Sequence, residues 1–203
     1  MTRIVADDKI PFLRGALDEV AEISYMPGNR ITSSDLKHAD CLITRTRTRC
    51  DRSLLEGTKI RLIASATIGF DHIDTDYCRS AGIKWTNAPG CNASSVQQYL
   101  VSTLLYLARH MDFQLGDLTL GVIGVGNVGS LVSQAAEVMG LRVLLNDPPL
   151  QRAEKSKRFT ELEQLLEEAN IITLHVPLNR GGKDNTYRMV DRAFLDRIRK
   201  GTI

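Results

Sequence analysis

The sequence predicts an α/β protein made of two parallel-sheet domains in succession. Three observations lead to this prediction. Short apolar runs of strand length alternate with helical segments along the whole chain, which is the pattern of parallel sheets covered on both faces. A glycine-rich loop at 124–129 stands between an apolar strand and an amphipathic helix. A single acid, Asp147, directly follows the next strand.

The first half, residues 1–92, is expected to hold five strands joined by short helices, in a flavodoxin-like arrangement. Helix starts are indicated by Pro11, which the first helical turn tolerates, and by the capping residues Ser33 or Ser34 and Asp51 or Ser53. The expected strands are 3–6, 20–25, 41–44, 60–64 and 83–86, and the last helix is 74–81.

The second half, residues 93–203, is expected to be a Rossmann domain, a doubly wound parallel sheet. It opens with a long helix at 93–110, whose apolar residues recur at helical spacing. Thr160, three residues before Glu163, resembles a capping box. Strands are expected at 118–124, 142–146 and 171–175, and helices at 128–140, 160–169 and 191–199. An apolar segment begins at Thr202–Ile203, so we expect a domain that is incomplete at its C-terminus and a parent protein that is longer.

The glycine loop has the spacing of a dinucleotide-binding motif in the context that the motif requires. Gly124 permits a tight turn, Gly126 leaves room for a pyrophosphate, and Gly129 lets the helix pack against the strand. The helix N-terminus at Asn127 and Val128 offers free N–H groups to the phosphates.

Asp147 lies 18 residues after Gly129, at the end of the second strand of this half. A carboxylate at that place accepts hydrogen bonds from the adenosine ribose and repels a 2′-phosphate, which favours NAD over NADP. The alternative is a glycine-rich turn with an incidental Asp.

The next strand ends at the same edge of the sheet, where ligands of such sheets bind. His175, Val176 and Pro177 are therefore expected beside the adenosine. For His175 a second reading stays open, in which the ring packs against the sheet.

Composition excludes several classes of partner. The net charge is +2, too small to indicate a nucleic acid or a membrane surface. No apolar run approaches the ~20 residues of a membrane span, and the N-terminus lacks the apolar core of a signal peptide. The four cysteines show no metal-ligand spacing. We expect a cytoplasmic protein without a metal, whose thiols are buried or incidental.

Two further stretches carry a resemblance to a known family. Asn87-Ala88-Pro89-Gly90-Cys91-Asn92-Ala93 is similar to the hinge motif of the D-isomer-specific 2-hydroxyacid dehydrogenases, and Gly69-Phe70-Asp71-His72-Ile73-Asp74 is similar to a loop of their first domain. The order of the domains is also theirs. Within the family, 4–12, 89–93 and 146–149 are similar to one member that acts on a phosphorylated acid. The resemblance covers essentially all 203 residues.

The resemblance implies oxidation of the 2-hydroxyl of a small phosphorylated 2-hydroxy acid, with hydride passing to NAD, in a homodimer when the protein is complete. By position, Thr46 and Thr67 match the family's substrate contacts in the first, substrate-binding domain. Arg45, Arg47 and Arg49 alternate with threonines and share one face if the strand continues. Arginine suits phosphate geometry, and Arg45 is the best candidate of the three. The alternative is a solvated charge run.

The family's Arg, Glu and His of catalysis are implied to lie beyond residue 203, so no catalytic residue is assigned and the chain is expected to be inactive alone. None of His38, His72, His110 and His175 is expected to replace the missing base. Two other readings stay open: another D-2-hydroxyacid dehydrogenase, such as one acting on phosphoglycerate, and a non-enzymatic NAD sensor on the same scaffold.

Overall fold

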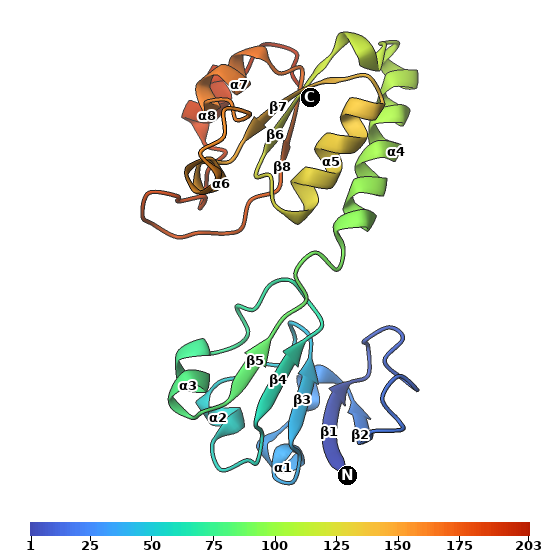
Figure 1. Ribbon diagram of the computed structural model, residues 1–203, viewed down its shortest axis with the longest axis vertical. Coiled ribbons are helices and arrows are strands. Elements are labelled where there is room, and N and C mark those ends of the chain that lie inside the picture. The colour runs from blue at the N-terminus through green and yellow to red at the C-terminus, as the bar shows by residue number, and fades with distance from the viewer. The chain divides into compact units, whose positions relative to one another are not determined.

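The computed structural model describes residues 1–203, which divide into two compact units, Met1–Cys91 and Asn92–Ile203 (Figure 1). The division lies between residues 91 and 92, one residue before the boundary expected between residues 92 and 93. Each unit has its own parallel sheet. The elements of unit 1 are β1 (Thr2–Asp7), β2 (Ala21–Met26), the 3-10 helix η1 (Gly28–Arg30), α1 (Ser33–Leu36), β3 (Cys41–Thr44), α2 (Arg52–Leu55), β4 (Leu62–Ser65), α3 (Thr75–Ser80) and β5 (Lys84–Thr86).

The sheet of unit 1 has the strand order β2-β1-β3-β4-β5, with every neighbouring pair parallel. This is the flavodoxin-like order, as the sequence predicts. Alternate strand residues such as Val5, Leu42 and Ile63 pack under α1, α2 and α3 in one core. Ile4 and Cys41 face the other way and form a second, smaller core.

The helix expected after Pro11 is absent, and residues 8–20 form a series of turns. Phe12 and Gly15 have positive φ values of 59° and 85°, which a right-handed helix cannot contain. Leu13 and Leu17 from these turns pack partly buried on the smaller core. The apolar residues that follow Pro11 therefore belong to a folded loop that covers the sheet.

Two helix caps also differ from expectation. Thr32, and neither Ser33 nor Ser34, caps α1, and its N–H donates to the Asp35 carboxylate at 2.8 Å. Asp51 caps α2, one of the two expected choices. The N-cap of the helix Leu162–Glu168 is Glu161 and not Thr160, whose N–H donates to the Leu145 carbonyl at 2.6 Å at the edge of the second sheet.

Unit 2 begins with the long helix α4 and continues as alternating strands and helices. Its helix α6 is absent from the elements expected from sequence. The elements are α4 (Ala93–Met111), the 3-10 helix η2 (Leu115–Asp117), β6 (Thr119–Ile123), α5 (Asn127–Val138), β7 (Arg142–Asn146), α6 (Pro148–Glu154), α7 (Leu162–Glu168), β8 (Ile171–Leu174) and α8 (Arg192–Arg197).

The sheet of unit 2 has the order β7-β6-β8, all parallel. Phe159 adds an isolated parallel bridge to Leu145 on β7. Ile203 donates to the Asn170 carbonyl at 3.0 Å and accepts from the Ile172 N–H at 2.9 Å, beside β8. Numbered along the chain, these segments lie in the order 3-2-1-4-5 of a Rossmann sheet. β8 is thus the fourth segment of the sheet and not the third, because the third is reduced to one residue.

Two helical layers cover this sheet (Figure 1). Leu104 of α4 and Val132 of α5 share a core with Leu120 and Val122 of β6. Leu165 of α7 belongs to the core on the opposite face. The carboxyl ends of β6, β7 and β8 remain uncovered by these layers, which leaves the edge of the sheet open for a site.

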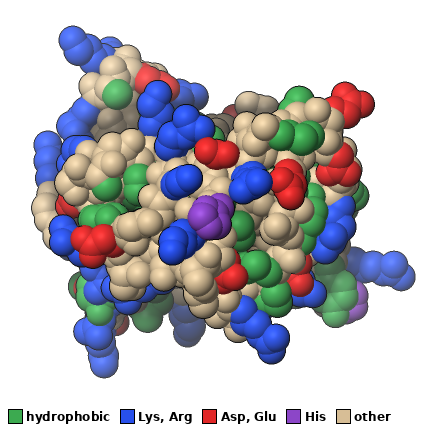
Figure 2. Space-filling view, turned by 90° about the horizontal axis from the view of Figure 1, so that it is seen from below, with side chains coloured by type: hydrophobic (Ala, Val, Ile, Leu, Met, Phe, Trp, Pro, Cys, Tyr) green, Lys and Arg blue, Asp and Glu red, His purple; other side chains and the backbone are tan.

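No helix of the structure combines the length and apolar character that crossing a membrane requires. On the face that Figure 2 presents, Lys and Arg side chains are scattered among acidic and apolar ones.

Candidate functional site

A cavity of about 370 Å³ lies at the carboxyl ends of the strands in unit 2. Three chain segments that the sequence singled out line it: the glycine loop with Gly124 and Gly126, the end of β7 with Asp147, and the end of β8 with His175, Val176 and Pro177. β6 and β8 are the first and fourth segments of the sheet, so the cavity lies where the strand order reverses. That is where open α/β sheets bind ligands.

Each of the three glycines of the loop suits its position for a different physical reason. Gly124 has φ +87°, and a Cβ there would lie 2.7 Å from the His175 carbonyl carbon. A Cβ on Gly129 would lie 2.0 Å from the Gly124 carbonyl oxygen, so this glycine lets α5 approach the loop. A Cβ on Gly126 would meet no atom within 4 Å. Because Gly126 has a φ of −73° and lines the cavity, the space beside it is open to a ligand.

Asn127 and Val128 begin α5 just behind Gly126, and neither lines the cavity. The helical hydrogen bonds of α5 begin at the Gly126 carbonyl, which accepts from the Ser130 N–H at 3.0 Å. The N–H groups of the first turn, Asn127 to Gly129, therefore have no acceptor within the helix. A helix start of this kind favours an anion.

The Asp147 carboxylate is held by two backbone groups. Oδ2 accepts from the Val125 N–H at 2.8 Å, and Oδ1 accepts from the Leu150 N–H at 2.9 Å. Asp147 thus caps α6 and ties it to the glycine loop. Each oxygen keeps lone pairs for a further donor, so the carboxylate is fixed in place and still able to accept hydroxyl hydrogen bonds.

His175 lies half-buried in the cavity wall. Its backbone N–H donates to the Ile123 carbonyl at 2.7 Å, and the ring Nε2 lies 3.0 Å from Thr173 Oγ1. Burial lowers the pKa of the ring below its ordinary value of 6.5, which favours the neutral imidazole. The ring both packs at the sheet edge and lines the cavity, so the two readings of this residue are compatible.

The outer wall of the cavity comes from residues that sequence reasoning missed. Arg152 belongs to α6, and Lys183, Asp184 and Met189 belong to the segment that follows β8. A signal for α6 was present, because Asp147 followed by two prolines is a capping residue with prolines in the first helical turn. The segment after β8 carries no comparable signal.

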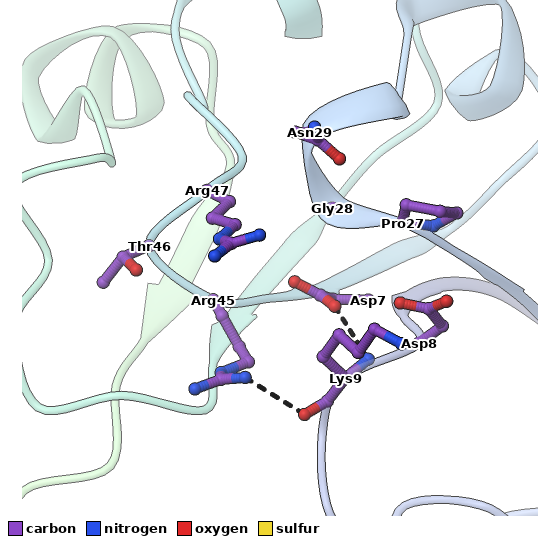
Figure 3. A pocket seen from close by; sticks show the side chains of 9 residues that line it. All are labelled: Asp7, Asp8, Lys9, Pro27, Gly28, Asn29, Arg45, Thr46 and Arg47. Carbon is purple, nitrogen blue, oxygen red and sulfur yellow. Dashed lines mark hydrogen bonds between the residues drawn. The ribbon is translucent and has the colours of Figure 1, made fainter.

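A second cavity of about 550 Å³ lies in unit 1 (Figure 3). It is formed where β1 and β3 end and where η1 begins. Its lining residues are Asp7, Asp8, Lys9, Pro27, Gly28, Asn29, Arg45, Thr46 and Arg47.

Charged groups of both signs meet in this cavity. Arg45 Nη1 donates to the Lys9 carbonyl at 3.1 Å, and the Lys9 N–H donates to Asp7 Oδ1 at 2.9 Å. Asp7 is only 3% exposed, and a Cβ on Gly28 would lie 2.3 Å from its Oδ2. The glycine therefore makes room for a buried carboxylate. Oδ1 of Asp8 is buried without a hydrogen-bond partner.

The third strand ends where expected and does not continue through Arg49, so the condition for the three arginines to share one face of a strand is not met. β3 ends at Thr44, and the chain turns, with the Thr48 N–H donating to the Arg45 carbonyl at 3.4 Å. The turn still places Arg45 and Arg47 in one cavity, while Thr46 between them points to the other side of the loop (Figure 3). Arg49 does not line this cavity but lines two shallow depressions, one with Arg47 and one with Thr46, and it pairs with Asp51 at 3.0 Å.

Thr67 does not line the large cavity of unit 1. Its hydroxyl lies 2.7 Å from Ser65 Oγ and donates to the Gly69 carbonyl at 2.9 Å. Gly69 and His72 line a shallow depression that also contains Thr46. His72 Nε2 lies 3.2 Å from Ser65 Oγ, and burial lowers the pKa of this ring. Thr46 and the segment carrying Thr67 are thus brought to one surface.

The remaining histidines and the cysteines are distributed as isolated groups. His38 and His110 are exposed, and His110 Nδ1 contacts the Tyr106 carbonyl at 2.9 Å. Cys41, Cys50 and Cys78 are buried free thiols, and Cys91 is exposed. No group of three or more His, Cys, Asp or Glu residues is placed to hold a metal ion.

Comparison with known proteins agrees with this architecture. A relative from Bacteroides fragilis named erythronate-4-phosphate dehydrogenase is 50% identical over 202 residues, which is 99% of this chain and 58% of that protein. The chain thus spans just over half of that relative's length. The relative bears out the expected resemblance of the chain to one member enzyme.

Two solved structures are likewise similar to nearly the whole of this chain and match it over about two thirds of their own length. D-lactate dehydrogenase from Aquifex aeolicus, in complex with NAD and lactic acid, superposes with a TM-score of 0.75 at 28% identity, over 96% of this chain and 66% of that one. NAD⁺-bound 3-phosphoglycerate dehydrogenase from Entamoeba histolytica gives 0.72 at 26% identity, over 88% and 64%.

The family model described as "D-isomer specific 2-hydroxyacid dehydrogenase, catalytic domain" matches residues 2–181, most of the chain. This match extends through both units, from β1 into the segment after β8. The chain therefore belongs to the D-isomer specific 2-hydroxyacid dehydrogenase family.

Proposed function

We propose that the cavity of unit 2 binds NAD. The observation that carries this proposal is the empty space at Gly126, where an added Cβ would meet no atom within 4 Å, beside the free N–H groups of α5. A pyrophosphate fits that space and those donors. Two relatives above 25% identity were solved with NAD or NAD⁺ bound, which supports the choice of ligand.

Different residues of the cavity bind different parts of the cofactor. The first turn of α5, Asn127 to Gly129, holds the pyrophosphate, and Asp147 accepts hydrogen bonds from the adenosine ribose. Val176, Pro177 and Met189 supply apolar walls for the adenine. NAD, when bound, supplies the hydride acceptor. Asp147, fixed by Val125 and Leu150, orients the ribose and so the whole cofactor.

We infer that the substrate is 4-phospho-D-erythronate, oxidised at its 2-hydroxyl with hydride passing to NAD. The name of the relative at 50% identity supports this substrate. The cavity of unit 1 supports a phosphorylated acid, because Lys9, Arg45 and Arg47 line it together. Arginine binds phosphate oxygens through two parallel N–H groups. Thr46 offers its hydroxyl to the carboxylate end of the acid, and Thr67 would do the same by releasing the Gly69 carbonyl.

The proposal places the family's catalytic Arg, Glu and His outside the 58% of the relative that this chain matches. The chain of residues 1–203 is then a binding part that does not turn over alone. The complete protein works in the cytoplasm as a homodimer, on the biosynthetic route to vitamin B6.

Two measurements test these statements separately. Calorimetric titration of the chain with NAD⁺ should show saturable binding, and its absence would contradict the assignment of the cavity. A turnover assay of the same chain with 4-phospho-D-erythronate should show no steady formation of NADH. Steady turnover would contradict the placement of the catalytic groups.

A second candidate substrate is 3-phosphoglycerate, because the Entamoeba histolytica relative is named for it. Both acids carry a phosphate and a 2-hydroxyl, and they differ by one hydroxymethylene group. Comparing kcat/KM of the full-length protein on the two acids decides between them. If the full-length protein binds NAD and oxidises neither, an NAD-sensing role gains support.

A further inference from the structure

The cavity of unit 2 has a charged outer end that the pyrophosphate and adenine do not need. Arg152, in the last turn of α6, and Lys183 bring positive charges to its wall. Asp147 and Asp184 bring negative ones. The four charges cancel, although guanidinium and ammonium groups are the side chains that bind phosphate.

The Arg152 guanidinium already has an acidic partner. Its Nη2 donates to Asp184 Oδ2 at 2.6 Å in an ion pair whose side chains are 40% and 33% exposed. This pair joins α6 to the segment after β8 across the outer end of the cavity. Lys183 makes no ion pair in the structure.

Asp184 is positioned by the backbone of its own segment. Asn179 Nδ2 donates to the Asp184 carbonyl at 3.2 Å, and the Thr186 N–H donates to the Asn179 carbonyl at 3.0 Å. Gly181 N–H donates to Asn185 Oδ1 at 2.8 Å. These bonds close the segment into a loop that presents Asp184 to Arg152 without using the Asp184 carboxylate. A change at this carboxylate thus alters charge and leaves the loop bonds intact.

We propose that Asp184 is a specificity-determining residue that keeps Arg152 from binding the 2′-phosphate of NADP, so that the cavity selects NAD. This inference rests on the proposed binding of a nicotinamide dinucleotide there. A 2′-phosphate on a ribose held by Asp147 would lie beside α6. Arg152 follows Asp147 by five residues, about 7.5 Å along a helix axis.

Two physical effects act against the 2′-phosphate in this arrangement. Arg152 would have to leave Asp184 to reach it, which breaks a charge-assisted hydrogen bond. Asp184 would then face a phosphate of like charge. Asp147 adds a repulsion of its own, so two carboxylates act against NADP, and sequence reasoning recognised only Asp147.

The test compares NAD⁺ and NADP⁺ binding to the chain of residues 1–203 by calorimetry. Asp184→Asn keeps the shape of the side chain and removes its charge, so it should tighten NADP⁺ binding about tenfold, or 1.4 kcal/mol, near the lower end for a hydrogen bond to a charged group. NAD⁺ affinity should stay within about twofold, because NAD carries an uncharged hydroxyl and no phosphate at that place. Asp184→Ala should behave the same way, and thermal melts check that each variant folds.

Two further variants test whether the gain in NADP⁺ affinity depends on Asp184 and Arg152 in particular. Glu154→Gln is the matched control, since Glu154 pairs with Arg158 at 3.0 Å at the end of the same helix and does not line the cavity. It should change neither affinity. The double variant with Asp184→Asn and Arg152→Gln should lose most of the gain in NADP⁺ affinity, because the released cation is gone and only the relief of the repulsion by Asp184 remains.

The outcomes separate the two proposals. NAD⁺ binding by the wild-type chain without any gain in the Asp184 variants overturns the role of Asp184 and leaves the NAD site standing. A gain that persists in full without Arg152 also overturns it. A wild-type chain that binds neither dinucleotide refutes the NAD site and this inference with it.

Discussion

Gly126→Ala should weaken NAD binding without unfolding the protein. An added methyl group at Gly126 meets no protein atom within 4 Å, and the φ of −73° suits alanine. Alanine is a poorer helix cap than glycine, but the substitution also reduces the freedom of the unfolded chain. The two effects oppose each other, so the free energy of unfolding should change by less than about 1 kcal/mol.

The methyl group would instead occupy the space that the pyrophosphate needs. If the phosphate loses one hydrogen bond to the first turn of α5, the cost is about 1.5–3 kcal/mol, because the acceptor is charged. This corresponds to an increase in Kd of about 10- to 150-fold. Calorimetric titration with NAD⁺ measures the Kd, and urea unfolding measures the stability.

Two other glycines of unit 2 supply the comparison. Gly116→Ala is the control, since its Cβ would lie 3.8 Å from the nearest atom, outside the cavity, and it should change neither quantity. Gly129→Ala would place a Cβ 2.0 Å from a carbonyl oxygen and should destabilise the fold by about 1–3 kcal/mol. A Gly126→Ala chain that folds and binds NAD⁺ as the wild type does would refute the reasoning.

Three further predictions concern other parts of the chain. In the full-length protein, Arg45→Ala should raise KM for the phosphorylated acid about tenfold or more, since a charged hydrogen bond is lost; an unchanged KM in steady-state kinetics would remove Arg45 from the phosphate site. Burial lowers the pKa of His175, so the unfolded chain binds more protons than the folded chain below pH 6.5. Stability should therefore fall as the pH drops below that value, and His175→Asn should flatten the dependence in melts at several pH values; an unaltered profile would contradict this. Cys91 alone should react with a thiol reagent in the folded chain, because the other three thiols are buried and burial raises the pKa of one of them, Cys50, to about 12; rapid labelling of a second thiol would refute the burial.

Much of the cofactor site could be predicted because its signals are local. Gly124 and Gly129 report close backbone approaches and Gly126 reports space for a ligand, and the strand before them is apolar except for Thr119. Asp147 follows its strand without a gap. These features depend on neighbours within a few residues, which is the range over which a sequence pattern can be interpreted.

Other features depend on contacts that a sequence pattern does not report. The turns at 8–20 carry apolar residues at helical spacing, but Phe12 and Gly15 adopt positive φ values as Leu13 and Leu17 pack on the sheet. The third segment of the Rossmann sheet is one bridge at Phe159, too short for any periodicity. The Arg152–Asp184 pair joins residues 32 positions apart. Such pairings are decided by the tertiary structure.

The position of α4 determines how this protein can be divided for experiments. The helix precedes the glycine loop, yet Leu104 is buried in the core of unit 2 and Gln97 Nε2 donates to the Leu131 carbonyl of α5 at 3.2 Å. A fragment starting at Leu118 would leave the apolar side of α5 in water and should aggregate. An expression fragment for the dinucleotide-binding unit should instead begin at Asn92, where the chain passes between the units.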